Sequence, residues 1–197
     1  MEKQLVSIVT PCYNEEENVV EVYKQVKLVI DNHFDKYEYE HIFIDNASTD
    51  KTVELLKNIA KQDSNIKIII NSRNFGHIRS PFYAMMQAKG DVVILLVADL
   101  QDPPQMIVDF LKAYEDGSNI VLGIKTSSQE NGLMYQIRTW YYKFLQKISD
   151  VEMFENNTGF GLYDKKSMLA LKNMPDAYPF FRGMVAEIGF KVEKIPY

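Results

Sequence analysis

The first half of the chain alternates short, nearly continuous apolar runs with longer segments in which apolar residues recur every three or four positions. An apolar run without polar alternation is typical of a strand buried on both faces, as in a parallel sheet covered by helices. The longer segments are typical of the helices that cover such a sheet. Strands are therefore predicted at Leu5–Thr10, Glu40–Asp45, Ile66–Ile70, Asp91–Ala98 and Asn119–Ile124.

Two of the segments between these strands carry a clear apolar stripe. The first stripe is Val19, Val22 or Tyr23, Val26 and Ile30, and the second is Val53, Leu56, Ile59 and Ala60. Alternating strands and helices indicate βα units. The sequence therefore predicts an α/β fold with a Rossmann-like, mainly parallel sheet flanked by helices.

The second half of the chain is less regular. Residues 132–150 predict a long helix, residues 156–174 a loop, a short strand and a helix, and residues 179–197 a helix and a closing strand. The helix at 132–150 sets Trp140 and Tyr142 beside Arg138 and Lys143. It is expected either to pack on the core or to lie on a membrane surface.

Composition narrows the function classes. A chain of 197 residues with 46% hydrophobic residues fits a single domain. Its net charge of −5 argues against a nucleic-acid binder with a broad basic surface. The single cysteine, Cys12, excludes an intrachain disulfide, and no run approaches the ~18 apolar residues that span a bilayer.

Polar side chains follow the first four predicted strands at the point where each strand ends. Ligands of open α/β sheets bind outside the carboxyl ends of the strands, so these side chains are expected at one edge. They are Pro11, Tyr13, Asn14 and Glu15 after the first strand, Asp45, Asn46, Ser48, Thr49 and Asp50 after the second, Arg73, Asn74, Gly76 and His77 after the third, and Asp99, Gln101 and Asp102 after the fourth.

Each of these residues alone also has a purely structural interpretation. Ser48 or Thr49 can cap the next helix, with Asp50 favoured in its first turn. Tyr13 and His77 can be ordinary loop residues, in the same way that Cys12 can be core packing.

The acids after the fourth strand indicate a metal site. Asp99 and Asp102 precede the double proline Pro103–Pro104, and Mg²⁺ or Mn²⁺ prefers one or two carboxylates together with phosphate oxygens. The same acids can alternatively form an Asx turn before a helix. The sequence lacks the P-loop motif and the G-x-G-x-x-G motif, which leaves a diphosphate held by a metal as the favoured interpretation.

Five segments in this order resemble family 2 glycosyltransferases of the GT-A fold, and most closely the polyprenyl-phosphate (dolichyl- or undecaprenyl-phosphate) glycosyltransferase branch. They are "VSIVTPCYNEEENV", "FIDNASTDKT", "SRNFGH", "GDVVILLVADLQDPPQMI" and "PFFRGMVAEIGF". The resemblance covers nearly the whole chain. It implies one GT-A catalytic domain over residues 1–197 and inverting transfer of a sugar from a nucleoside diphosphate sugar.

The resemblance also implies a role for each motif residue. Pro11, Tyr13, Asn14, Glu15, Asp45 and Asn46 would bind the nucleotide, Arg73 and His77 would lie near the base or the diphosphate, and Asp99 and Gln101 would hold Mg²⁺ or Mn²⁺. A metal neutralises the charge that develops on the leaving diphosphate, and so lowers the barrier to transfer.

The chain departs from the family at three places. Val97 stands where relatives carry the first acid of an Asp-Ala-Asp motif, and Asn46 stands where an aspartate is common. Around Gly159, Phe160, Gly161 and Leu162, the acid and the arginine of the branch are absent. The acceptor is left open, with Asp102, Asp164, Arg182 and Glu187 as candidates to act on it; Asp102, Arg182 and Glu187 are the favoured catalytic residues.

The expected donor is a UDP-sugar, with GDP-mannose open, and the expected acceptor is a lipid phosphate or a cell-surface glycan. The resemblance implies a longer protein with membrane helices after this domain, at the cytoplasmic face of the membrane. A membrane surface and a homo-oligomer remain open as partners, and nucleic acid is not expected. A competing hypothesis is a sugar-nucleotide-binding module with little or no transferase activity, indicated by Val97, Gly159 and Gly161.

Overall fold

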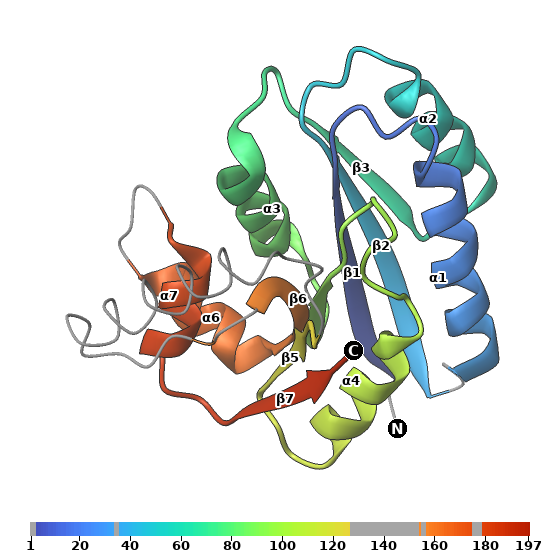
Figure 1. Cartoon of the computed structure of the whole chain (residues 1–197). Coiled ribbons are helices and arrows are strands. Elements are labelled where there is room, and N and C mark those ends of the chain that lie inside the picture. The colour runs from blue at the N-terminus through green and yellow to red at the C-terminus, as the bar shows by residue number, and fades with distance from the viewer. Residues whose placement is uncertain (1–2, 34–35, 127–153, 155–156, 175–178) are drawn as a thin grey trace.

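The computed structural model describes residues 3–33, 36–126, 154, 157–174 and 179–197. Within these residues, one seven-stranded sheet has the order β3-β2-β1-β4-β6-β5-β7 (Figure 1). Every neighbouring pair is parallel except the two that β6 makes, with β4 and with β5. The strands are β1 (Gln4–Cys12), β2 (Tyr37–Asp45), β3 (Ile66–Ile70), β4 (Val92–Leu95), β5 (Ile120–Ile124), β6 (Asn157–Asp164) and β7 (Val192–Pro196).

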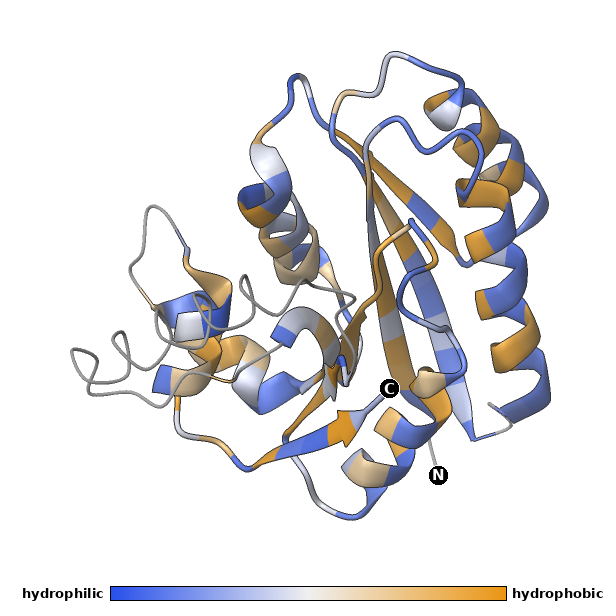
Figure 2. Ribbon diagram, viewed as in Figure 1, coloured by the Kyte–Doolittle hydropathy of each residue, from blue (hydrophilic) through white to orange (hydrophobic). Residues whose placement is uncertain are grey.

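Helices cover both faces of this sheet, as the buried strands require. Apolar residues concentrate on the strands and on the helix sides that meet them (Figure 2). One face is covered by α1 (Val19–His33), α2 (Thr52–Gln62) and α4 (Met106–Glu115), and the other by α3 (Gly76–Gln87), α6 (Lys165–Asn173) and α7 (Phe181–Glu187). The predicted α/β fold with a mainly parallel sheet is confirmed.

The predicted elements are present where the hydrophobic pattern is regular. The stripe of α1 is buried at Val19, Val22, Val26 and Ile30, and α2 buries Leu56 and Ile59. The fourth strand is shorter than predicted, because the regular ladder ends at Leu95 and the chain turns at Leu100, whose φ is 57°. The helix predicted at 132–150 lies outside the described residues.

Helix α3 was not predicted from the sequence. It begins in the loop segment that contains His77 and has Pro81 inside it. Proline removes one backbone hydrogen bond from a helix and is a usual sign of a helix end. Burial of Pro81, Ala84 and Met85 against the sheet stabilises the helix in spite of that loss.

The topology brings many chain segments to one edge of the sheet. The carboxyl ends of β1, β2, β3 and β4 meet there, because these strands are parallel. β5 and β7 also end at this edge, and β6 begins there. No helix in the described part of the chain is long and apolar enough to cross a membrane.

Candidate functional site

A cleft of about 760 Å³ opens at this edge, between the strand ends, α3 and the start of α7. The predicted site residues that line it are Pro11, Tyr13, Glu15, Asn46, His77, Asp99 and Arg182. The predicted residues that do not line it are Asn14, Asp45, Arg73, Gln101, Asp102 and Glu187. The structure therefore brings seven of these thirteen residues together around one cavity.

The loops after β1 and β2 are held together by side chains that sequence reasoning assigned to a ligand. The backbone N–H of Asn14 donates to Ser48 Oγ at 2.8 Å, and Asn14 Oδ1 accepts from the backbone N–H of Thr49 at 2.8 Å. The N-cap residue of α2 is Lys51, and its side chain makes no capping hydrogen bond. The alternative interpretation of Ser48 or Thr49 as the helix cap is therefore wrong, since both residues fix the neighbouring loop.

Asp45 lies behind the cleft wall, fully buried and paired in register with Cys12, which lines the cleft. Its Oδ2 accepts from the backbone N–H of Ser48 at 3.0 Å. Its Oδ1 has no hydrogen-bond partner within the described residues. A buried acceptor without a partner is costly, and this oxygen lies behind the cleft lining rather than in it.

Asn46 also lines the cleft, but the protein already uses its whole amide group. Oδ1 accepts from Asn71 Nδ2 at 3.1 Å and from the backbone N–H of Phe75 at 2.9 Å. Nδ2 donates to Asn74 Oδ1 at 2.9 Å and to the backbone oxygen of Gly76 at 3.3 Å. Asn46 therefore positions the loop that leads into α3 and, through it, His77.

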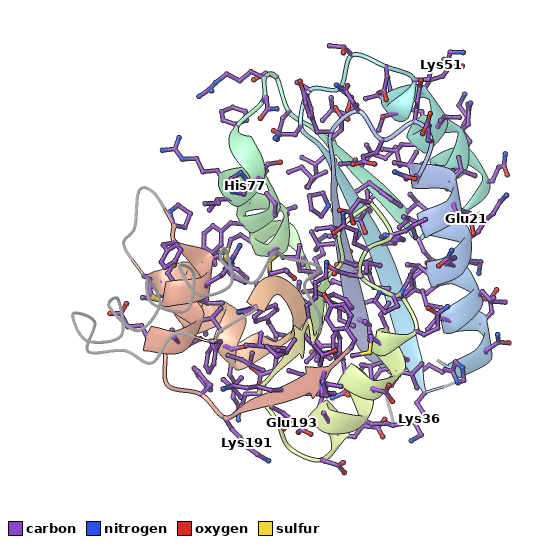
Figure 3. The ribbon with its side chains drawn as sticks, in the orientation of Figure 1. Glu21, Lys36, Lys51, His77, Lys191 and Glu193 are labelled. Carbon is purple, nitrogen blue, oxygen red and sulfur yellow. The ribbon has the colours of Figure 1, made fainter. Side chains whose placement is uncertain are left out.

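Arg73 is exposed and does not line the cleft. Its guanidinium lies over the ring of Phe75, 4.2 Å from the centroid. The exposed His77, in contrast, lines the cleft from the first turn of α3 (Figure 3). The two cationic candidates after β3 therefore differ in their access to a ligand.

Cys12 lines the cleft with 4% of its surface exposed. Burial, together with the negative charges of Asp45 and Glu15, raises the pKa of its thiol far above the ordinary value. The thiol stays protonated at neutral pH, and a protonated thiol is a poor nucleophile. The structure thus confirms the interpretation of Cys12 as packing.

The loop after β4 holds Asp99 at the cleft. Asp99 Oδ1 accepts from the backbone N–H of Gln101 at 3.0 Å, so the predicted Asx turn is present at this acid. Asp99 is exposed, and its second oxygen remains available for a cation. No group of three or more His, Cys, Asp or Glu side chains is placed to hold a metal within the described residues. The donor set therefore fits a cation that takes one carboxylate from the protein and its other ligands from phosphates and water.

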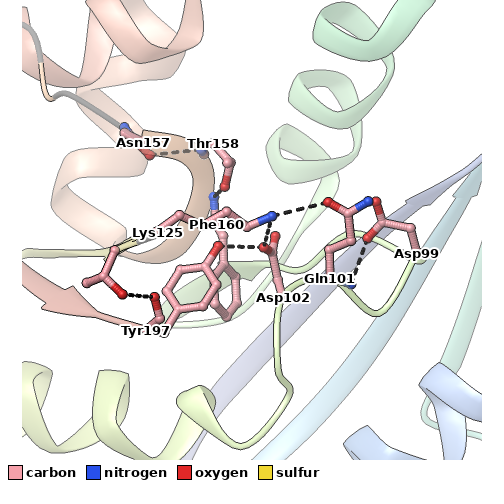
Figure 4. Close-up of polar contacts among 10 residues, drawn as sticks. Asp99, Gln101, Asp102, Lys125, Asn157, Thr158, Phe160 and Tyr197 are labelled. Atoms are coloured by element: carbon pink, nitrogen blue, oxygen red, sulfur yellow. Dashed lines mark hydrogen bonds and ion pairs between the residues drawn. The ribbon is translucent and has the colours of Figure 1, made fainter. Parts of the chain in front are cut away.

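Gln101 and Asp102 are bound by Lys125, a residue that the sequence analysis missed (Figure 4). Lys125 Nζ donates to Gln101 Oε1 at 3.2 Å and lies 3.5 Å from Asp102 Oδ1. The hydroxyl of Tyr197 donates to the same Asp102 oxygen at 2.5 Å. Burial and the Asp102 carboxylate raise the pKa of Tyr197, so this hydroxyl remains a donor. Asp102 is 2% exposed, and its carboxylate pairs with Lys125 and the Tyr197 hydroxyl.

The far half of the cleft is aromatic. It is lined by Phe82, Phe154, Phe180 and Phe181 together with Met85 and Leu95. Arg182 adds a positive charge to this half, and Thr158 adds a hydroxyl. Glu187, five residues further on in α7, is exposed and does not line the cleft. The cleft thus joins a polar half beside the strand ends to an apolar half that includes the positive charge of Arg182.

The segment that departs from the branch motif is taken up by packing. The ring of Phe160 packs against Phe110 and Tyr197, with centroids 4.9 and 5.5 Å away. At Gly161, an added Cβ would lie 2.3 Å from the backbone oxygen of Val121. Strand β6 therefore has no space at position 161 for the side chain of an arginine.

Comparison with known proteins places this architecture in a family. The model of glycosyl transferase family 2 matches residues 7–184. An uncharacterized glycosyltransferase of Bacillus subtilis, YkcC, is 33% identical over 192 residues, which cover 97% of this chain and 59% of that protein. The bactoprenol glucosyl transferase of Shigella phage SfV is 30% identical over 193 residues, which cover 98% of this chain and 62% of that protein. The chain thus spans about three fifths of the length of these relatives.

Solved structures share the fold. Staphylococcus aureus TarS in complex with UDP-GlcNAc superposes with a TM-score of 0.61 at 18% identity, over 98% of this chain and 56% of that one. The mannosyltransferase PcManGT of Pyrobaculum calidifontis, in complex with GDP-Man and Mn²⁺, superposes with a TM-score of 0.64 at 18% identity, over 100% of this chain and 56% of that one. These likenesses confirm the predicted GT-A fold.

Proposed function

Because this chain belongs to glycosyl transferase family 2, we propose that it transfers a sugar, with inversion, from a nucleoside diphosphate sugar to a polyprenyl phosphate. A UDP-sugar is the favoured donor, and GDP-mannose is the second choice. Relatives named bactoprenol glucosyl transferase support this acceptor class, and solved structures of the fold hold UDP-GlcNAc or GDP-Man.

The donor occupies the polar half of the cleft in this proposal. Tyr13 and Pro11 contact the base, and Asp45 orders the adjoining loop by accepting from the backbone N–H of Ser48. Asp99 supplies the protein ligand to Mg²⁺ or Mn²⁺. When it is bound, a divalent cation stabilises the negative charge of the leaving diphosphate. His77 also lines the cleft and contacts the donor in this proposal.

The positions of the carboxylates in the cleft favour one class of acceptor. Among the described residues that line it, Glu15 and Asp99 bear carboxylates, and both lie beside the strand ends that bind the donor. Asp102 is buried and engaged, and Glu187 lies outside the lining. A hydroxyl acceptor needs a base to remove its proton, whereas a phosphate acceptor arrives ionised. The phosphate acceptor therefore fits this cleft better than a glycan hydroxyl.

Arg182 and the aromatic half complete the proposal. A guanidinium matches the geometry of a phosphate and can hold it through two parallel hydrogen bonds. Phe180 and Phe181 lie next to Arg182 in sequence, and they offer apolar surface to the first units of the prenyl chain. An acceptor of this class is held in a lipid bilayer, so the reaction is proposed to occur at a membrane surface.

Binding and turnover test the proposal. UDP-sugars or GDP-mannose with Mn²⁺ should raise the melting temperature, and a prenyl phosphate should receive the sugar while the unphosphorylated prenol does not. The Arg182→Ala variant should raise the KM for the prenyl phosphate and leave nucleotide affinity unchanged. The proposal fails if no nucleotide sugar shifts the melting temperature, and its acceptor part fails if prenol and glycan hydroxyls react as well as the phosphate.

A second function is favoured by one observation. Val97 lines the cleft where an acid of the metal motif is expected, so the domain could bind a sugar nucleotide without turning it over. The Val97→Asp variant separates the two functions, because it adds a second carboxylate next to Asp99. A binding module predicts no wild-type transfer and a gain of transfer in the variant, whereas robust wild-type turnover excludes it.

A further inference from the structure

Ser80 is a polar residue of the cleft that lies outside the family motifs. It is in the second turn of α3, it is 2% exposed, and it lines the cleft. Its hydroxyl oxygen accepts a hydrogen bond from Asn71 Nδ2 at 2.9 Å, and Asn71 does not line the cleft. The serine hydroxyl is therefore held from the protein side and borders the space that a ligand would fill.

The direction of this hydrogen bond is fixed by the backbone. Asn46 Oδ1 accepts from the backbone N–H of Phe75 at 2.9 Å, so this amide atom is an oxygen. The Asn71 atom that contacts Asn46 Oδ1, at 3.1 Å, must then be the amide nitrogen. The same nitrogen contacts Ser80 Oγ, and an amide nitrogen can only donate. The Ser80 oxygen is therefore an acceptor in this contact, and its own proton points elsewhere.

The proton of the Ser80 hydroxyl has no acceptor within the described residues. A helical serine commonly donates to the backbone oxygen four residues before it, which here belongs to Gly76. That oxygen accepts from Asn46 Nδ2 instead, at 3.3 Å. A buried hydroxyl that does not donate forfeits a hydrogen bond, and a ligand in the cleft can supply the missing acceptor.

The strand order separates Ser80 from the proposed metal ligand. Asn71, which contacts Ser80, follows β3, and its partner Asn46 follows β2, whereas Asp99 lies in the loop after β4. In the order β3-β2-β1-β4, β2 and β4 are two positions apart, which is roughly 10 Å at the usual spacing of strands. A nucleotide whose diphosphate meets a cation at Asp99 therefore extends its base toward β2, β3 and Ser80.

We propose that the Ser80 hydroxyl donates a hydrogen bond to a carbonyl oxygen of the donor's base, and that Asn71 orients it. This inference rests on the proposed function and names a residue of its donor site. Uracil and guanine both carry such an oxygen, so the contact suits a UDP-sugar and GDP-mannose alike. Contact with Tyr13 and Pro11 does not select one edge of the base, whereas a directed hydroxyl does.

The test compares Ser80→Ala with a matched control. Ser118 is 1% exposed, donates to Glu193 Oε2 at 2.7 Å and lies shortly before β5, outside the cleft lining. The affinities for UDP, 2-thio-UDP, 4-thio-UDP and pyrophosphate are measured by calorimetry with Mn²⁺ for the wild type, Ser80→Ala and Ser118→Ala. Far-UV circular dichroism and the melting temperature report whether each variant is folded.

The loss of one hydrogen bond between neutral groups should weaken UDP binding about threefold to tenfold in Ser80→Ala. Pyrophosphate binding should stay the same, and Ser118→Ala should bind every ligand as the wild type does. Sulfur is a weaker acceptor than oxygen, so one of the two thio analogues should bind the wild type more weakly than UDP does. That difference should vanish in Ser80→Ala, and the analogue concerned identifies the carbonyl.

Three results would overturn the inference. If folded Ser80→Ala binds UDP as the wild type does, the hydroxyl donates to no atom of the nucleotide. If pyrophosphate loses as much affinity as UDP, the contact is to a phosphate and not to the base. If both thio analogues differ from UDP equally in the wild type and in Ser80→Ala, the carbonyl is not the acceptor. A wild type that binds no UDP is a separate result, because it refutes the proposed function itself.

An exchange of donor for acceptor at position 71 provides an independent check of the positioning role. In Asn71→Asp, the carboxylate accepts from Ser80 and turns its proton away from the cleft. UDP binding should weaken about as much as in Ser80→Ala, and the substitution should have no further effect in the Ser80→Ala background. Equal effects of Asn71→Asp in both backgrounds would contradict the positioning role.

Discussion

Replacing Asn46 by aspartate is expected to destabilise the protein. Asn46 is 6% exposed, and each atom of its amide group meets two partners. The orientation of the amide is fixed by the backbone: the N–H of Phe75 requires an acceptor, and the oxygen of Gly76 requires a donor. A carboxylate keeps the acceptor side and loses both donors.

The expected size of the effect follows from the two lost hydrogen bonds. Asn74 Oδ1 and the Gly76 oxygen would lose the donor of Asn46 and face a negative charge instead. Each partly buried polar group that loses its partner costs about 1–3 kcal/mol, so the unfolding free energy should fall by about 2–4 kcal/mol. For a domain of this size, that corresponds to a fall of about 4–16 °C in melting temperature.

The pH dependence gives a second signature. Burial disfavours the charged form, so the pKa of the new carboxyl group should lie above its value of about 3.9 in the unfolded chain. Its protonated form recovers one donor. The deficit of the Asn46→Asp variant should therefore be largest at pH 7 and shrink as the pH falls toward 5.

Urea denaturation at pH 7 and pH 5 measures both effects. Asn58→Asp is the matched control, because Asn58 is exposed on α2 and the same chemical change there should alter stability by less than about 0.5 kcal/mol. The reasoning is refuted if Asn46→Asp is as stable as this control at pH 7. A deficit that grows toward pH 5 would also contradict it.

Two further predictions concern the sheet. Gly161→Ala should lower the unfolding free energy by about 3 kcal/mol or more in a denaturation experiment, because the new Cβ would lie 2.3 Å from the backbone oxygen of Val121. A loss below about 1 kcal/mol would show that β6 can shift away from this contact. Burial opposes ionisation of Glu40, but hydrogen bonds from Lys67 and Ser7 outweigh it and hold the pKa of Glu40 below its usual value. Glu40→Gln should therefore lower the unfolding free energy by about 1–3 kcal/mol at pH 7. In urea titrations, the difference in unfolding free energy between wild type and variant should narrow as the pH falls below about 4.3, because the wild type then loses this contribution. A difference that stays constant from pH 7 to pH 3 would contradict the prediction.

The hydrophobic pattern was sufficient to predict strands β1 to β5 and the helices α1 and α2. The short apolar run Ile66–Ile70 is typical of a buried strand, and the stripe of α1 has the period of a helix. Helix α3 was missed because Pro81 and the polar loop before it suggest a break, and packing against the sheet overrides that local signal. Lys125 follows the fifth strand, where the same strand-end rule applies, but a single lysine after a short apolar run gives no distinct signal in the sequence.

The strand-end rule identifies the edge that binds ligands, but it does not identify which side chains remain free to bind one. Asn14, Asn46 and Asp102 all lie at that edge, and each accepts a hydrogen bond from a neighbouring segment of the protein. The free energy of a loop at a strand end depends on such contacts, since its backbone donors and acceptors leave the ladder there. A site at this edge therefore needs two sets of polar residues, one that orders the loops and one that meets the substrate. Both sets consist of the same polar residue types, so the sequence does not distinguish them. The hydrogen-bond partners of each side-chain atom do.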